Sequence, residues 1–169
     1  RFVYEQKLIG RRNIRVETAS GNMTLELTPE NDVIVNMGPP ILAPADVPFI
    51  PESSDKSQAV SYKIEVAGHG RIELGAVSMG NPHAVIIVDD IDTAAVETLG
   101  PLVEAHTSFP AKVNAGFMQI INRNHIKLRV FERGVGETKA CGTGACGAVV
   151  SGILRGLLDH TVQVDLPGG

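Results

Sequence analysis

A glycine-rich turn, Gly142-Thr143-Gly144, leads into the most apolar helical segment of the chain. The apolar residues of this segment recur with a period near 3.6 and lie on most sides of the predicted helix: Ala145, Val149, Val150, Ile153, Leu154, Leu157 and Leu158. A helix that is apolar nearly all round is a buried one. We therefore expect this helix to lie at the centre of the fold, with other elements wrapped around it.

Much of the remaining sequence alternates apolar and polar residues as half-buried strands do. The strand-like stretches are residues 13–19, 23–28, 33–37, 58–66, 71–77, 84–88, 117–122, 125–131 and 161–166. Two short helices, 93–99 and a second that restarts at Pro101 toward residue 106, are also predicted. The pattern indicates an α+β fold, in which a curved, mostly antiparallel sheet or barrel wraps around the central buried helix.

The organisation of the chain is marked by a proline-rich segment. Residues 38–57 carry five prolines and few periodic apolar positions, which is typical of a domain boundary or of a long surface loop. The chain starts with Arg1, and residues 1–9 have the pattern of a helix end, with Gly10 as the residue that follows it. Pro167-Gly168-Gly169 is a turn signal after the last strand. We expect the chain to be part of a longer protein.

The composition of the chain indicates which partners and which cellular compartment to expect. Fifteen Lys and Arg against nineteen Asp and Glu give a net charge of −4, and there is no Trp. This balance argues against nucleic-acid and membrane partners, since both favour a basic face. No apolar run approaches the ~20 residues of a membrane span. With only two cysteines the chain is no disulfide scaffold, and we expect both to be reduced in the cytoplasm.

The most informative single residue is Cys141, which stands just before the predicted helix. Backbone amides and the helix dipole favour negative charge there, so the sequence predicts a lowered thiol pKa. The amides of Gly142 and Thr143 can hold a substrate carboxylate. The alternative is that Cys141 is a small buried residue in a capping turn. Cys146 is predicted to be a core residue, and its spacing from Cys141 is unlike that of zinc sites, so we predict no metal.

Three further segments carry polar side chains with two interpretations each. Glu132 and Arg133 are solvated charges at a strand end, or a pair that binds a charged ligand, with Glu132 able to tune a thiol. Asn81 and His83 belong to an ordinary Asn-Pro turn and loop, or His83 is a charge partner for a thiol. Asn114 is a turn residue, or forms two hydrogen bonds to a zwitterion.

Together these segments resemble the diaminopimelate epimerase family over nearly the whole chain. The residues that carry the resemblance are Met79-Gly-Asn-Pro-His83, Asn114-Ala-Gly-Phe-Met-Gln119, Glu132-Arg-Gly-Val-Gly-Glu-Thr138 and Ala140-Cys-Gly-Thr-Gly-Ala-Cys146. The resemblance implies the epimerase-like fold and an isomerase that interconverts LL- and meso-2,6-diaminopimelate without cofactor or metal, in lysine and peptidoglycan precursor biosynthesis. It also implies that residues 1–41 end one epimerase domain, that 42–169 form most of a second, and that the full-length form can be a homodimer.

The resemblance implies a role for each matching residue. Cys141 is one of two catalytic acid/base cysteines, and His83 and Glu132 orient or tune the thiols. The substrate-binding positions are Asn81, Asn114, Glu132, Arg133, Gly142 and Thr143.

Two departures from the family pattern stand out. The family's other catalytic cysteine belongs to an earlier motif that this sequence does not contain, and Cys146 does not replace it because it lies along the same helix as Cys141. We therefore expect the 169-residue chain alone to be inactive. Ala84 also stands where relatives often have Cys, at a position that is neither of the two acid/base cysteines.

Other functions remain open. One is another cofactor-independent racemase or epimerase of this fold, such as one acting on proline or hydroxyproline. Another is a non-catalytic module that binds an amino acid. A third is a thiol hydrolase with His83 as its base.

Overall fold

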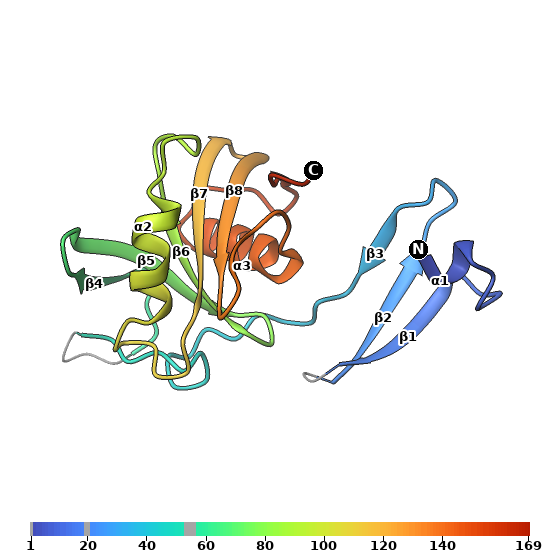
Figure 1. Cartoon of the computed structure of the whole chain (residues 1–169), viewed down its shortest axis with the longest axis horizontal. Helices are drawn as coiled ribbons and strands as arrows, with labels where there is room; N and C mark the ends of the chain where they lie inside the picture. Colours follow the sequence, from blue (N-terminus) through green and yellow to red (C-terminus); the bar gives the residue numbers. More distant parts are fainter. Residues whose placement is uncertain (1, 19–20, 53–56) are drawn as a thin grey trace. The chain divides into compact units, whose positions relative to one another are not determined.

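The computed structural model of the chain describes residues 2–18, 21–52 and 57–169. It divides into two compact units, one ending at Gly38 and the other running Pro39–Gly169 (Figure 1). The division falls at the start of the proline-rich segment. The assignment of 1–41 and 42–169 to two epimerase domains stays a prediction.

The first unit is a small antiparallel sheet. It contains helix α1 (Phe2–Glu5) and strands β1 (Asn13–Thr18), β2 (Gly21–Leu27) and β3 (Val33–Val35), in the order β1-β2-β3. The predicted hairpin is present, but part of its turn, Ala19 and Ser20, lies outside the described residues. The helix ends at Glu5, well before Gly10, because Lys7 has a left-handed backbone with φ of 54°.

The second unit is built on a seven-stranded sheet. Its strands are β4 (Tyr62–Val66), β5 (Gly70–Ser78), β6 (Pro82–Ile87), β7 (Asn114–Asn122), β8 (His125–Glu132), β9 (Gly136–Thr138) and β10 (Gln163–Asp165). The order is β10-β8-β7-β6-β5-β4, and β9 pairs with β8. Only β6–β7 and β8–β10 are parallel among these pairs. The predicted α+β class and mostly antiparallel sheet are confirmed, but the strands of the described residues do not close into a barrel.

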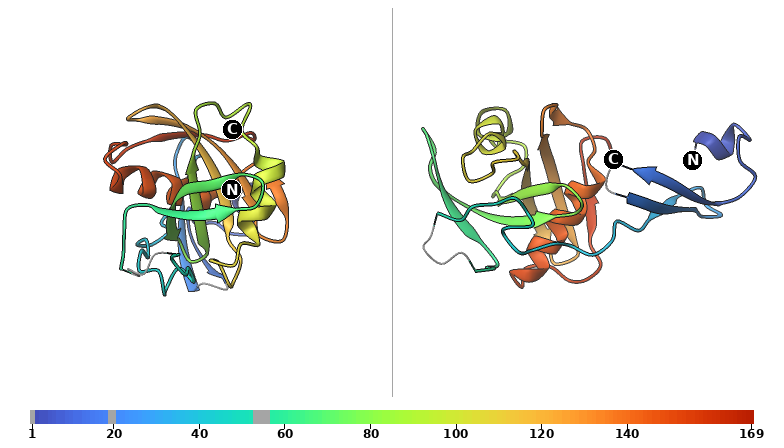
Figure 2. Two further views of the ribbon diagram at one scale, coloured as in Figure 1. Left: turned by 90° about the vertical axis from the view of Figure 1, so that its left-hand side faces the viewer. Right: turned by 90° about the horizontal axis from the view of Figure 1, so that it is seen from below.

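Two helices pack on opposite faces of this sheet (Figures 1 and 2). Helix α3 (Gly142–Leu154) follows the predicted glycine-rich turn, and its buried side is made of small residues: Gly144, Gly147, Ala148, Ser151 and Gly152. These allow the helix to approach the strands closely. The sequence predicts a helix enclosed nearly all round, yet Leu154 is 40% exposed. The difference arises because the described residues cover α3 mainly from its small-residue side.

Helix α2 (Val96–Glu104) runs through Pro101 as one helix, whereas the sequence predicts two pieces. The N–H that proline lacks would have bonded to the carbonyl of Glu97, which lies on the exposed side where water can take its place. Gly100 sets the packing distance, since a Cβ there would lie 2.8 Å from the Cβ of Phe131 on β8. In the described part of the chain, no helix is long and apolar enough to cross a membrane.

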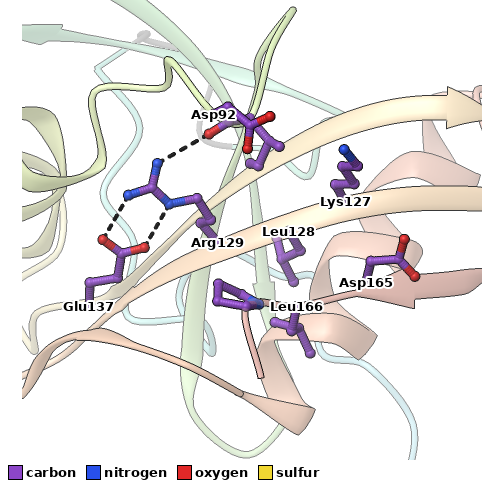
Figure 3. Close-up of a pocket in the computed structure, with 9 residues that line it drawn as sticks. Asp92, Lys127, Leu128, Arg129, Glu137, Asp165 and Leu166 are labelled. Atoms are coloured by element: carbon purple, nitrogen blue, oxygen red, sulfur yellow. Dashed lines mark hydrogen bonds and ion pairs between the residues drawn. The ribbon is translucent and has the colours of Figure 1, made fainter. Parts of the chain in front are cut away.

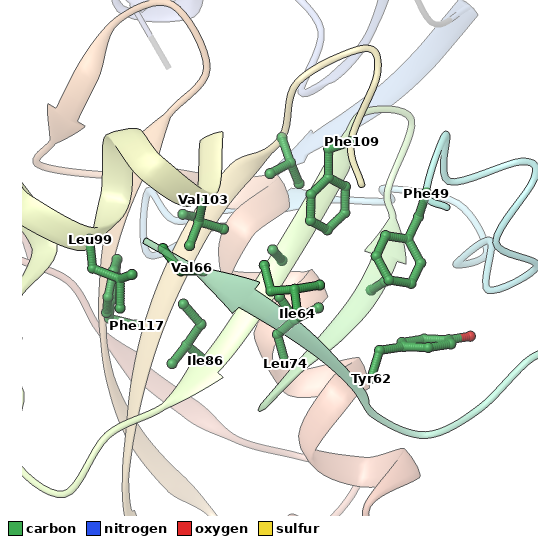
Figure 4. Packing of buried hydrophobic residues seen from close by; sticks show 14 of the residues in the cluster. Phe49, Tyr62, Ile64, Val66, Leu74, Ile86, Leu99, Val103, Phe109 and Phe117 are labelled. Carbon is green, nitrogen blue, oxygen red and sulfur yellow. The ribbon is translucent and has the colours of Figure 1, made fainter. Parts of the chain in front are cut away.

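The apolar core therefore has two layers separated by the sheet. Because neighbouring side chains of a strand point to opposite faces, Phe117 of β7 packs on the α2 side and Met118 on the α3 side. The α2 layer, shown in Figure 4, includes Leu99, Val103 and the aromatic group of Phe49, Tyr62 and Phe109. The two core layers cover both faces of the sheet, and the polar residues described below gather at one end of it.

Candidate active site

Strand pairing brings the predicted polar segments to one end of the sheet. In the parallel β6–β7 pair, His83 is directly opposite Asn114. In the antiparallel β7–β8 pair, Ala115 is opposite Phe131, which puts the end of β8 beside the start of β7. We call the residues that meet here, with the N-terminus of α3, the site cluster: Asn81, His83, Asn114, Glu132, Arg133, Cys141, Gly142 and Thr143.

Asn114 joins three segments of the site cluster. It is 3% exposed and is the first residue of β7, so the turn interpretation is wrong, while its two hydrogen bonds to a zwitterion remain a prediction. Its Nδ2 donates to the carbonyl oxygen of Pro82 at 3.1 Å, and its Oδ1 accepts from the backbone amide of Arg133 at 2.8 Å. Asn114 thus fixes the Asn-Pro-His turn relative to the end of β8.

His83 is a buried, neutral histidine. Its ring Nε2 lies 3.0 Å from Oδ1 of Asn81, and an amide oxygen only accepts, so Nε2 carries the proton. Burial, and secondly the charge of Arg133, lower the pKa of His83 to about 4. The surface-loop interpretation is wrong, since His83 is only 1% exposed. The neutral ring also cannot supply the positive charge that a charge partner for a thiol requires.

Cys141 is the N-cap residue of α3, as predicted, with an extended backbone at φ −142° and ψ 99°. Its Sγ lies 3.7 Å from the hydroxyl oxygen of Thr143, and Ala145 donates the first helical hydrogen bond to the Cys141 carbonyl at 2.9 Å. The amides of Gly142 and Thr143 precede that first bond, so they are available to an anion by the geometry of a helix start.

The expectation of a lowered Cys141 pKa is wrong for this structure. Burial of the sulfur raises the pKa of the thiol most strongly. The Gly144 amide and the Thr143 hydroxyl lower it, as a helix N-terminus should, while the neighbouring carboxylate of Glu132 raises it further. Desolvation disfavours the charged thiolate, and here it outweighs the helix amides. Cys141 is therefore a protonated thiol at neutral pH.

Glu132 and Arg133 are held by contacts on either side of the end of β8. The Thr138 hydroxyl of β9 donates to Oε1 of Glu132 at 2.5 Å. Arg133 donates from Nη1 to the carbonyl oxygen of Ala111 at 2.9 Å. Glu132 is half-buried, whereas Arg133 is an exposed charge at the end of the strand, as one of the two interpretations expects.

Sequence reasoning missed two residues that organise this region, Thr138 and Glu104. Thr138 lies on β9, a short strand that the sequence suggests only as a loop. Glu104 is the last residue of α2 and is 7% exposed. The helix dipole disfavours a negative charge at a helix C-terminus. A carboxylate at the end of a predicted helix was therefore the sequence signal that could have pointed to Glu104.

A surface hollow lies beside the β8–β9 hairpin (Figure 3). Its lining includes Lys127, Arg129, Glu137 and Asp165. Arg129 forms two parallel hydrogen bonds to the Glu137 carboxylate, at 2.7 and 2.9 Å, and a third to the carbonyl of Ile91 at 3.1 Å. This pair clamps β9 to β8. Within the described residues, no group of three or more His, Cys, Asp or Glu side chains is placed to hold a metal ion.

Comparison with known proteins identifies the family of the chain. The sequence profile of the family described as "Diaminopimelate epimerase" matches residues 75–169, which include the whole site cluster. The chain belongs to the diaminopimelate epimerase family. It is 54% identical over 169 residues to the diaminopimelate epimerase of Pseudomonas paraeruginosa strain PA7 and 57% identical over 168 residues to that of Thioalkalivibrio sulfidiphilus strain HL-EbGR7. These alignments cover 100% and 99% of this chain but 59% of either relative.

Solved structures show that the epimerase fold extends beyond close relatives. A probable proline racemase from Agrobacterium radiobacter K84 matches with a TM-score of 0.60 at 19% identity, over 91% of this chain and 49% of the racemase. A hydroxyproline epimerase from Agrobacterium vitis matches with a TM-score of 0.58 at 17% identity, over 94% of this chain and 50% of that protein. At such identities the likeness supports the fold alone.

Proposed function

We propose that the full-length gene product containing this chain interconverts LL- and meso-2,6-diaminopimelate, and that Cys141 is one of its two acid/base groups. The observation that carries the proposal is the meeting of the Cys141 thiol, the N-terminus of α3 and the Glu132–Arg133 pair in one cluster. The family membership and the high identity to diaminopimelate epimerases support it. The reaction needs no cofactor under this proposal.

The geometry suits proton exchange at an amino-acid α-carbon. The substrate's carboxylate binds at the amides of Gly142 and Thr143, next to the thiol, with Arg133 supplying positive charge nearby. Glu132 raises the pKa of Cys141. A substrate ammonium that pairs with Glu132 removes part of that effect and brings the thiol closer to ionisation.

Inversion at the α-carbon requires two thiols, one that removes a proton and one that returns a proton. In one direction a thiolate takes the α-proton, so that an S–H bond forms and the Cα–H bond breaks, and a second thiol donates its proton to the opposite face. Cys146 does not supply the second thiol, because it is five residues along the same helix from Cys141. Under this proposal the second thiol comes from a motif that this sequence does not contain.

The competing functions are less well supported. A thiol hydrolase would use His83 as its general base, but a ring with a pKa of about 4 accepts a proton poorly at neutral pH. A binding module needs no thiol beside its carboxylate site. The proposal also includes a cytoplasmic location, which the free thiols of Cys141 and Cys146 fit, and a homodimeric full-length form.

The test is proton exchange followed by NMR in D₂O. We expect the full-length gene product to exchange the α-proton of LL- and meso-diaminopimelate and to convert each into the other, and Cys141→Ala to abolish both. The 169-residue chain alone should not invert the substrate. Turnover of proline or hydroxyproline instead would favour the alternative racemase, and binding without exchange in the full-length protein would favour the binding module.

A further inference from the structure

The buried carboxylate of Glu104 is used by neither the core nor the proposed chemistry. It stands at the C-terminal end of α2, where the helix dipole opposes a negative charge. It is 7% exposed, and burying a carboxylate is costly unless hydrogen bonds compensate. The structure shows where that compensation comes from, and it lies next to the site cluster.

Glu104 Oε1 accepts two hydrogen bonds, one from a residue 30 positions along the chain and one from a residue eight positions along. One comes from the backbone amide of Gly134 at 2.9 Å, in the turn between β8 and β9. The other comes from Nζ of Lys112 at 3.2 Å, in the segment that leads into β7. Gly134 donates from a left-handed backbone with φ of 73°, a conformation that favours glycine, whereas Lys112 donates from a side chain that is 55% exposed.

The segment that contains Lys112 also holds Arg133. Its backbone amide donates to Asn114, and its guanidinium donates to the carbonyl of Ala111. Gly134 is the next residue after Arg133, and Ala111 the one before Lys112. Glu104 therefore bridges the two short segments that fix the direction of the Arg133 side chain. Helix α2 is itself seated closely on β8 through Gly100 and Phe131, which gives the bridge a rigid base.

We propose that Glu104 is a positioning residue that holds the turn beginning at Arg133 and so fixes Arg133 for the substrate. The catalytic part of this inference rests on the proposed function, while the contact itself does not. Loss of the carboxylate frees the Gly134 amide and lets the turn move. Arg133 then binds the substrate less well, although it is still present.

The contact is tested first in the 169-residue chain, by the Gly134 amide signal in ¹H–¹⁵N NMR. We expect Glu104→Ala to shift this signal and to speed its hydrogen exchange, with a smaller change in Glu104→Gln, which keeps an acceptor oxygen. Lys112→Met should leave the Gly134 bond in place. The matched control is Glu97→Ala, which removes an exposed carboxylate from the same helix. An unchanged Gly134 amide in folded Glu104→Ala would overturn the proposal.

The action through Arg133 is tested by a double-mutant cycle in the full-length gene product. We expect Glu104→Ala to raise KM for diaminopimelate about tenfold, with a smaller effect on kcat. In an Arg133→Ala background the same change should have almost no further effect. Additive effects would overturn a role through Arg133. If the unmodified protein does not epimerise, the proposed function fails, and the Gly134 signal still decides the contact.

Discussion

The carboxylate of Glu132 favours the protonated state of the neighbouring Cys141 thiol. Glu132 raises the pKa of Cys141 both by its charge and by accepting a hydrogen bond from the protonated thiol. Burial acts in the same direction and is the larger effect. Cys141 is therefore protonated in this structure, and the thiolate forms only when the charges around the sulfur change.

This relationship predicts that Glu132→Gln activates Cys141 toward alkylation. Removing the carboxylate lowers the pKa of the thiol, so more thiolate is present at any pH below that pKa. We expect iodoacetamide to modify Cys141 several-fold faster at pH 8 in the variant than in the parent chain. The rate is measured by mass spectrometry in a Cys146→Ala background.

The control for this experiment is Glu137→Gln, whose carboxylate lies on β9 but pairs with Arg129. It should leave the alkylation rate of Cys141 close to that of the parent. A Glu132→Gln protein that reacts at the parent rate over the whole pH range would contradict the electrostatic account.

A second prediction concerns stability at low pH. The pKa of His83 is about 4 in the folded chain, against 6.5 for an unperturbed histidine. The unfolded state therefore binds the extra proton between these values. The stabilising contribution of the neutral ring is fully present above pH 6.5 and declines as the pH falls toward 4. We expect a loss of about 3 kcal/mol in the free energy of unfolding from this group.

Urea unfolding at a series of pH values measures this contribution. His83→Gln should be less stable than the parent at pH 7 and should show a flatter decline toward pH 4. His69→Gln, at an exposed position, is the matched control and should keep the parent slope. If the parent and His83→Gln lose stability equally, His83 is not the titrating group.

A third prediction concerns Ser151 on the buried side of α3. Its hydroxyl is buried and has no hydrogen-bond partner among the described residues. A buried unpaired hydroxyl is unfavourable, and alanine is the better helix former, so Ser151→Ala should raise stability by about 1 kcal/mol. Thermal unfolding followed by circular dichroism measures the change. A loss of stability of similar size would mean that the hydroxyl is paired in solution.

The close packing of Ser151 against Gly75 provides a control for this prediction. A Cβ added at Gly75 on β5 would lie 2.1 Å from the Ser151 oxygen. Gly75→Ala should therefore destabilise the chain, by about 1–3 kcal/mol. Combining Gly75→Ala with Ser151→Gly should recover part of the lost stability. If a substitution to glycine far from Gly75 recovered as much, the loss would not come from a local clash.

A fourth prediction concerns the clamp between Arg129 and Glu137. Both side chains are about three-quarters buried, with exposures of 24% and 23%, and the guanidinium contacts both carboxylate oxygens. A lysine cannot form two parallel hydrogen bonds, so Arg129→Lys should cost about 1 kcal/mol. A double-mutant cycle with Glu137→Gln measures the coupling between the two groups. Strict additivity of the two changes would show that the ion pair does not contribute.

The sequence alone was sufficient to predict most of the strands and the helix after Cys141. Alternation and turn residues located most strands of both units, because these signals are local. The parallel pairing of β6 with β7 was not predictable in this way, since no local pattern says which strands meet. The single helix through Pro101 was missed because tertiary packing of Gly100 on Phe131 outweighs the local effect of proline.

The site shows the same division between local and non-local information. Motif spacing and family resemblance singled out Cys141, Glu132 and Arg133. The direction of the Cys141 pKa was wrong because burial depends on the whole fold, whereas the helix N-terminus is visible in the sequence. Glu104 was missed for a related reason, since its partners Gly134 and Lys112 become neighbours only after folding.

The parallel pairing of β6 with β7 also bears on how the chain reaches its native state. Pro82 and Asn114 are 32 positions apart and meet only when the connection through α2 has closed. The β5–β6 and β7–β8 hairpins can form from short-range contacts. The first carries Asn81 and His83, and the second carries Asn114 and Glu132. Closing long loops slows folding. We therefore expect the site cluster to assemble in the slowest step, so that until then the Cys141 thiol is open to oxidation.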